Sequence, residues 1–200
     1  MTLALGRLER RDLPAAAQLL GRGMRDNPIN IRAFAIADDI ARERALARFF
    51  LPVARGLWMR GEMLTATSDG KFVGVCGLAP PRHCQPGIFE KLRIAPSLLL
   101  QHPPATALRV MAWTGAWAKA DPREPHWHVG PVAVDASLQG RGIGSAMLRS
   151  VCERMDRSGA AAYLETDKPE NVRFYQRFGF QVTGECRVLN VQNWFMTRRR

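Results

Sequence analysis

The sequence predicts a mixed α/β protein in which helices pack against a central β-sheet. Three features support this prediction: a hairpin signal at Asp69-Gly70, a strand–loop–helix–strand unit in the second half, and two strand-like segments at the end. With 200 residues, 46% of them hydrophobic, the chain has enough apolar material for a core. We therefore expect one domain over residues 1–200.

The N-terminal half is expected to contain a strand, two helical regions and the hairpin. Asp12 is a good candidate N-cap for the first helix, and Pro52 is expected to interrupt the second helical region. Asp69-Gly70 can supply the positive φ angles of a tight turn. The expected elements are a strand over Leu3–Leu8, a helix from Pro14 to about Met24, a helical region over Asp38–Arg60, and strands over Met63–Thr67 and Phe72–Leu78.

The C-terminal half begins with a proline-rich connection, spanning roughly residues 80–104, and then alternates helices and strands. Gly179 is expected to cap the last helix. The expected elements are short helical pieces such as Ala95–Gln101, helices over Ala105–Ala120, Ile143–Arg157 and Pro169–Phe178, and strands over His128–Val134, Ala160–Glu165, Phe180–Leu189 and Asn193–Met196.

Composition limits the possible partners. Lys and Arg number 29 against 18 Asp and Glu, giving a formal charge of +11, but the arginines are scattered along the chain and no nucleic-acid-binding motif accompanies them. Four cysteines without C-x-x-C pairing predict reduced thiols and no metal site. No signal peptide and no apolar run of about 18 residues is present, so a cytoplasmic protein without nucleic-acid or membrane partners is expected.

A glycine-rich loop separates the strand ending at Val134 from the helix beginning near Ile143. Gly140, Gly142 and Gly144 alternate there, which leaves the backbone amides of residues 141–145 unpaired at a helix start. Such amides and the helix dipole favour an anion such as a pyrophosphate. The alternative is a turn without a ligand. A P-loop and a dinucleotide fingerprint are both excluded, because neither motif is present.

The loop resembles a known cofactor signature. Q-x-x-G-x-G, from Gln139 to Gly144, is similar to the acetyl-CoA motif of the GNAT acetyltransferase superfamily, and residues 171–180 resemble the family's following helix. The resemblance implies an acyl-CoA N-acyltransferase fold with a mixed, mostly antiparallel sheet of about seven strands flanked by helices. Segments 123–128, 163–166 and 194–198 are similar to the puromycin N-acetyltransferase branch.

The resemblance also implies residues that bind acetyl-CoA. Asn171 would hold the pantetheine arm, and Tyr175, four residues later on the same helix face, would protonate the departing thiolate. Phe174 could instead belong to the core. The implied cofactor-binding residues are Val132, Ala133, Val134, Gln139, Gly140, Arg141, Gly142, Ile143, Gly144, Ser145, Asn171, Phe174 and Tyr175.

The general base is left open. Family members that acetylate lysine carry a Glu six residues before the hydrophobic residue at the strand end, and counting back from Val134 gives His128. A histidine can accept a proton directly or through water. Glu165, His126 and water are the alternatives, and His83 could touch the acceptor.

The predicted function is acetyl transfer from acetyl-CoA to a primary amine of a small molecule, by direct attack in a ternary complex. A protein N-terminal or lysine acetyltransferase is the second interpretation. A non-catalytic CoA-binding module or a basic nucleic-acid-binding module is the third. The oligomeric state is expected to be a monomer or a homodimer.

Overall fold

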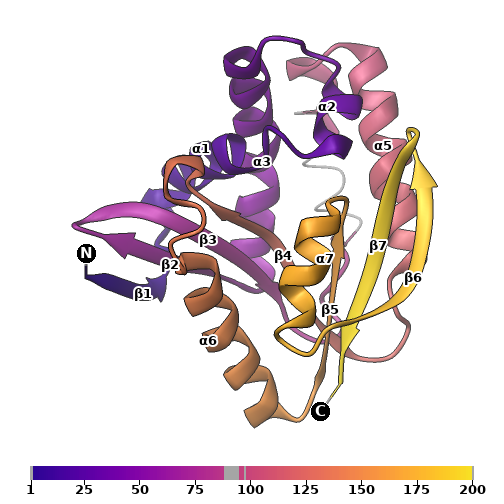
Figure 1. Cartoon of the computed structure of the whole chain (residues 1–200). Coiled ribbons are helices and arrows are strands. Elements are labelled where there is room, and N and C mark those ends of the chain that lie inside the picture. Colours follow the sequence, from indigo (N-terminus) through magenta and orange to yellow (C-terminus); the bar gives the residue numbers. More distant parts are fainter. Residues whose placement is uncertain (1, 88–94, 97, 200) are drawn as a thin grey trace.

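A seven-stranded sheet organises the computed structural model, which describes residues 2–87, 95–96 and 98–199 (Figure 1). The strand order is β1-β2-β3-β4-β5-β7-β6, and only the β4–β5 pair is parallel among these neighbours. The elements are β1 (Leu3–Arg7), η1 (Arg10–Asp12), α1 (Leu13–Met24), α2 (Pro28–Phe34), α3 (Asp39–Arg60), β2 (Glu62–Ser68), β3 (Lys71–Ala79), α5 (Pro104–Ala120), β4 (His126–Val134), η2 (Ala136–Leu138), α6 (Ile143–Ser158), β5 (Ala161–Thr166), α7 (Pro169–Gln176), β6 (Gln181–Val188) and β7 (Val191–Arg198). This mixed sheet flanked by helices confirms the predicted fold class.

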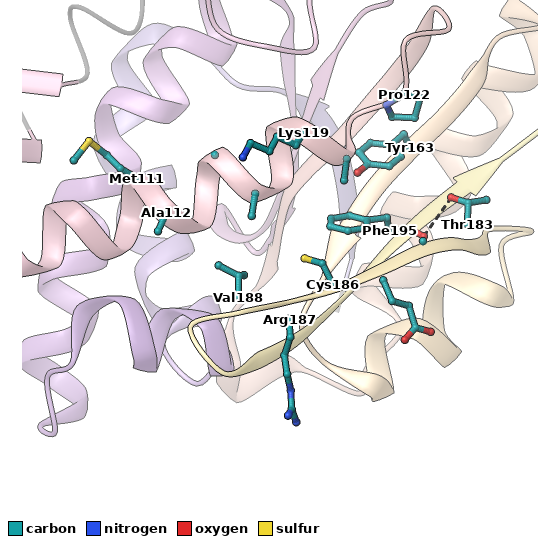
Figure 2. Close-up of a pocket in the computed structure, with 15 residues that line it drawn as sticks. Met111, Ala112, Lys119, Pro122, Tyr163, Thr183, Cys186, Arg187, Val188 and Phe195 are labelled. Atoms are coloured by element: carbon teal, nitrogen blue, oxygen red, sulfur yellow. Dashed lines mark hydrogen bonds between the residues drawn. The ribbon is translucent and has the colours of Figure 1, made fainter.

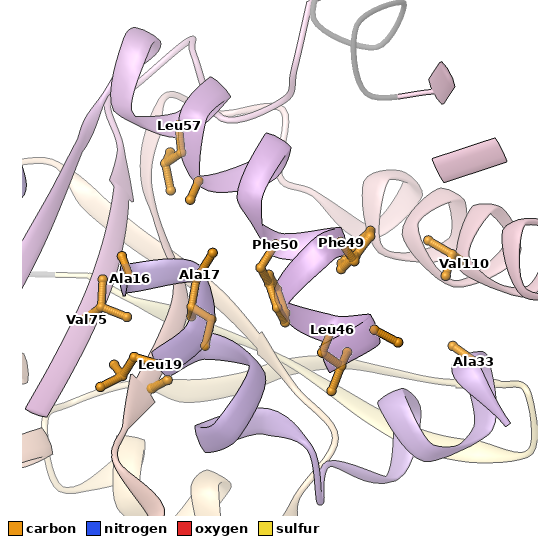
Figure 3. Packing of buried hydrophobic residues seen from close by; sticks show 14 of the residues in the cluster. Ala16, Ala17, Leu19, Ala33, Leu46, Phe49, Phe50, Leu57, Val75 and Val110 are labelled. Atoms are coloured by element: carbon orange, nitrogen blue, oxygen red, sulfur yellow. The ribbon is translucent and has the colours of Figure 1, made fainter. Parts of the chain in front are cut away.

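Helices cover both faces of the sheet and bury two separate hydrophobic clusters. On one face α1, α3 and α5 pack against the strands, and on the other face α6 and α7 do so (Figure 1). Successive strand residues point to opposite faces, so Val75 joins the first cluster and Cys76 joins the second. Figure 3 shows the first cluster, where Leu46 and Phe50 of α3 face Ala17 of α1.

The first half of the chain confirms the hairpin and corrects two helix predictions. Asp69 and Gly70 adopt φ angles of 50° and 74°, as a tight turn requires. Asp12 occupies the predicted N-cap position of α1, but it also belongs to the 3-10 turn η1 and its side chain makes no capping hydrogen bond. Pro52 does not interrupt α3, which runs continuously over 22 residues. Burial of Phe49 and Phe50 on the neighbouring turn offsets the cost of about 3 kcal/mol for an internal proline.

The second half matches the predicted order, with differences at element ends. The last helix, α7, ends at Gln176, two residues before the predicted end. Gly179 is therefore not its C-cap; it lies beyond the helix with φ 83° and redirects the chain into β6. Strand β4 starts at His126, two residues earlier than predicted, because its first residues pair with β5.

Helix α2 was not predicted from the sequence. It has seven residues, and its N-terminal amide at Ile29 donates a 2.7 Å hydrogen bond to Asp167, which lies 138 residues away in the chain. Asn27-Pro28 was a local helix-start signal, but a helix this short also depends on that distant acceptor.

The expected helical pieces within Ala95–Gln101 fall partly outside the described residues. Ala95, Pro96 and residues 98–101 are helical, as expected. Nothing in the described ranges forms a helix with the length and apolar character needed to span a membrane. Cys76, Cys84, Cys152 and Cys186 form no disulfide in the structure.

Candidate active site

Strands β4 and β5 diverge in the middle of the sheet. Their pairing ends at His128 and Tyr163, while β4 continues to Val134 along β3 and β5 continues to Thr166 along β7 (Figure 1). Within the described residues, the facing edges beyond that point have no strand partner. Backbone amides and carbonyls require partners. The divergence, which we call the slot, therefore leaves backbone groups that can pair with an extended ligand carrying amide groups.

The predicted glycine loop lies at the end of β4 and leads into α6. Gly140 and Gly142 have φ angles of 77° and 82°, which favour glycine, and a Cβ at either position would meet no atom within 4 Å. The first α6 hydrogen bond that closes a turn runs from Ala146 N to Gly142 O at 2.9 Å. The amides of residues 143–145 thus have no intrahelical acceptor. Open space beside free amides fits a pyrophosphate.

The loop, the end of β4 and α7 meet at Gly144. A Cβ placed there would lie 3.5 Å from Phe174 and 3.6 Å from Val134. Phe174 is partly buried against the second hydrophobic cluster, so it serves the core and also borders the loop. Gln139 folds back and donates a 3.3 Å hydrogen bond to the Val134 carbonyl. The structure thus brings the predicted cofactor-binding residues of β4, the loop and α7 together.

Helix α7 presents Asn171 and Tyr175 on one face. Asn171 is half-buried, whereas Tyr175 is 7% exposed and its ring packs against Phe174 and Phe180. Burial is the main cause that raises the pKa of Tyr175, and the nearby Cys76, Asp167 and Glu165 raise it further. Its phenol therefore keeps its proton at neutral pH, as a proton donor must.

A polar cluster lies on the opposite face of the sheet, below the end of α5. Nε2 of His128 lies 3.0 Å from Oε2 of Glu165, so two predicted base candidates form one pair. Asp121 Oδ1 lies 3.2 Å from His126 Nε2 and 3.5 Å from His128 Nδ1. His83, which was expected only to touch the acceptor, is exposed, and its Nδ1 lies 3.3 Å from its own loop's Pro81 carbonyl.

Opposing effects set the charges of this cluster. Burial alone would lower the pKa of His128, but the carboxylates of Glu165 and Asp121 outweigh it and raise that pKa to about 10. His126 behaves alike: burial lowers its pKa, and the hydrogen bond with Asp121 raises it to about 10. Burial would raise the pKa of Asp121, yet the two histidines hold it below its usual range.

Asp121 and Tyr163 were not recognised as site residues from the sequence. Asp121 directly follows α5, and an H-x-H segment begins five residues later. The Tyr163 ring makes edge contacts with both His126 and His128, at 5.4 and 5.5 Å between centroids. A carboxylate at a helix end before H-x-H was the available signal. The Tyr163 contacts depend on strand register and left none.

Asp167 was missed as well, and it joins α2 to the end of β5. Its carboxylate accepts hydrogen bonds from Asn27 Nδ2 at 3.1 Å and from Ile29 N at 2.7 Å. The residue is 4% exposed, and burial raises its pKa. This contact holds α2 beside the slot.

A groove of about 750 Å³ opens on the same face as the polar cluster, between α5 and β6. Figure 2 shows Tyr163 and Phe195 between Lys119 of α5 and Cys186 of β6. Because Tyr163 also contacts His126 and His128, the groove adjoins the polar cluster.

Comparison with known families gives one clear match. The profile described as the acetyltransferase (GNAT) family matches residues 34–180, which include the slot, the loop and α7. A mycothiol acetyltransferase from Brachybacterium faecium is 36% identical over 56 residues, covering 26% of this chain and 17% of the relative. The match thus spans about a sixth of that relative's length.

Solved structures share the fold over nearly the whole chain. One from Corynebacterium glutamicum, described as histone acetyltransferase HPA2 and related acetyltransferase, has a TM-score of 0.72 and 22% identity, covering 100% of this chain and 97% of its own. A polyamine N-acetyltransferase from Drosophila melanogaster has a TM-score of 0.59 and 16% identity, with all of both chains covered. At these identities the similarity supports the fold.

Proposed function

Because the chain belongs to the acetyltransferase (GNAT) family, we propose that it transfers an acetyl group from acetyl-CoA to a primary amine of a small molecule, by direct attack in a ternary complex. The observation that carries the proposal is the divergence of β4 and β5. The glycine loop and Tyr175 border this slot on one face, and the pair His128–Glu165 borders it on the other.

Acetyl-CoA would lie along β4, with its pyrophosphate at the N-terminus of α6. The loop residues 139–145 would hold the phosphates through backbone amides, helped by the exposed Arg141. Backbone groups of Val132, Ala133 and Val134 would hold the pantetheine arm, with Asn171 facing it from α7. When bound, acetyl-CoA supplies an electrophilic carbonyl and a thiolate leaving group.

Tyr175 would act as the general acid. Its buried phenol keeps its proton, and it lies on the face of the sheet that carries the loop and α6. A hydroxyl at this position can protonate a departing sulfur without first exchanging with bulk water.

The pair His128–Glu165 would receive the proton of the attacking amine. Glu165 is the accepting group, and His128, 3.0 Å away, orients its carboxylate. Because both residues lie on the face opposite Tyr175, the base and the acid approach the reacting atoms from two sides.

The groove beside Tyr163 would bind the acceptor. Its volume of about 750 Å³ and its mixture of apolar and charged lining fit a small molecule. The chain would belong to a branch similar to puromycin N-acetyltransferase, a proposal supported by segments 123–128, 163–166 and 194–198. Named relatives include both a polyamine enzyme and one described as a histone acetyltransferase, so the acceptor class needs a direct test.

The test is acceptor-dependent release of CoA thiol, with mass spectrometry of the product. A panel should contain small primary amines of varied apolar bulk, lysine peptides and peptides with free N-termini, each compared with hydrolysis in the absence of acceptor. We expect small amines with an apolar body to be acetylated on nitrogen. Acetylation of the peptides alone would refute the small-molecule acceptor, and failure to bind acetyl-CoA would refute the proposal as a whole.

A further inference from the structure

The polar cluster beneath α5 contains three atoms whose lone pairs converge. Oδ1 of Asp121, Nε2 of His126 and Nδ1 of His128 all lie within 4.8 Å of one another. None of the three residues is well exposed: their side chains are 11%, 4% and 17% accessible. The grouping draws on two elements, the end of α5 and strand β4.

The remaining ring nitrogens of both histidines face acceptors. Nδ1 of His126 donates to the carbonyl of Glu124 at 2.7 Å, since a carbonyl can only accept. Nε2 of His128 faces the Glu165 carboxylate at 3.0 Å. A metal ion would displace the inner proton of each ring, leave the outer proton in place, and take the inner nitrogen as a ligand beside the Asp121 carboxylate.

Three converging acceptors need a cation or additional protons. A proton on Nδ1 of His128 is not favoured, because this buried atom has no hydrogen-bond partner of adequate geometry among the described residues. Oδ1 of Asp121 lies 3.5 Å from it. The hydroxyl of Tyr163, a residue only 1% exposed, is likewise without a partner, and its ring packs against both histidines.

The distances suit a tetrahedral metal ion. Two ligand atoms about 2.1 Å from such an ion lie about 3.4 Å apart. The two Asp121–histidine separations are 3.2 and 3.5 Å. Histidines that bind metal usually direct their second nitrogen to a carboxylate or a backbone carbonyl, as His128 and His126 do here.

We propose that Asp121, His126 and His128 bind a divalent transition-metal cation of the Zn²⁺ class, with the fourth position open to water. Two imidazoles and one carboxylate suit such an ion, whereas Mg²⁺ and Ca²⁺ prefer all-oxygen ligands. The ion ties the end of α5 to β4 and fixes the His128 ring toward Glu165. This metal site differs from the sequence-based expectation of no metal. The proposal does not depend on which amine receives the acetyl group.

The test uses the untagged full chain, freed of metal by a chelator and titrated with Co²⁺ as a spectroscopic probe. We expect a visible absorption band of low-symmetry Co²⁺ that saturates at one ion per chain and is displaced by Zn²⁺ but not by Mg²⁺. His126→Gln and Asp121→Asn should each weaken binding by about 100-fold or more, since even changes to residues that only hydrogen-bond to the ligands weaken metal sites by about 10–100-fold. His83→Gln is the matched control, because it removes a histidine outside the cluster and should bind as wild type does.

Several results would overturn the proposal. The first is failure of the wild-type chain to bind Co²⁺ or Zn²⁺, and the second is binding that persists unchanged in both ligand variants. The third is loss of binding in Cys84→Ser alone. That loss would assign the ion to the Cys84 thiol, which donates to the His126 carbonyl at 3.2 Å. If the ligand variants do not fold, anomalous diffraction from wild-type crystals grown with Zn²⁺ decides the question. A peak among the three side chains supports the site, and its absence refutes it.

Discussion

The two faces of the slot between β4 and β5 are built in different ways. The face toward α6 and α7 takes its binding groups from two short continuous segments, residues 132–145 and 171–175. The face toward α5 takes Asp121, His128 and Glu165 from three separate elements. One face is encoded locally, and the other exists only after the sheet has formed.

The nature of the groups explains this difference. On the α6 face the groups are largely backbone amides, which become available wherever a glycine loop enters a helix, whatever the surrounding fold. On the α5 face the groups are side chains that meet because the register places His128 opposite Tyr163. A change on the first face should therefore alter acetyl-CoA binding, and a change on the second should alter acceptor turnover.

The largest expected effect comes from Glu165→Gln on the α5 face. Removing the proton acceptor while keeping its shape should lower kcat/KM for a verified acceptor by about 10²- to 10⁴-fold. The acetyl-CoA Kd, measured by calorimetry, should stay near the wild-type value. Glu153→Gln, an exposed change of the same type on α6, is the control. A parallel loss of acetyl-CoA affinity in Glu165→Gln would remove the distinction between the faces.

A somewhat smaller effect is expected for Tyr175→Phe on the α6 face. It keeps the buried ring packing and deletes the proton donor, so kcat should fall by about 10²-fold with little change in acetyl-CoA affinity. Tyr163→Phe removes the only other tyrosine hydroxyl in the chain, and it should change kcat far less. Single-turnover kinetics should accompany both variants, because slow product release can hide a chemical defect. Near wild-type single-turnover rates in Tyr175→Phe would contradict the acid role.

The smallest effect is expected for Asp167→Asn, which tests how α2 is held on the α5 face. Asn27 and Ile29 donate to different oxygens of the Asp167 carboxylate, and an amide keeps only one oxygen, so the free energy of unfolding should fall by about 1–3 kcal/mol. Denaturant unfolding measures this change, and steady-state kinetics should show a raised acceptor KM. Asp69→Asn in the exposed β2–β3 turn should stay within about 0.5 kcal/mol of wild type. An equal change in both variants would mean that the Asp167 contact does not stabilise α2.

Sequence reasoning recovered the parts of the molecule that depend on nearby residues. The order of strands and helices, the Asp69-Gly70 hairpin and the loop before α6 follow from local patterns. The continuity of α3 through Pro52 and the existence of α2 do not, because packing on α1 and the bond to Asp167 decide them. Asp121 is different, because the H-x-H segment after it was an available signal and only its distances to the two histidines depend on the fold.

One paired measurement tests most directly whether the slot and the glycine loop form the acetyl-CoA site. Gly142→Asp and Gly159→Asp place the same side chain at opposite ends of α6, at φ angles of 82° and 65° and with open space around each Cβ. Both variants bear similar backbone strain, but only the first puts a carboxylate beside the proposed pyrophosphate site. Isothermal titration calorimetry should show acetyl-CoA bound at least about 10-fold more weakly by Gly142→Asp, or about 1.4 kcal/mol, and unchanged by Gly159→Asp. Equal affinity in the two folded variants would contradict the account.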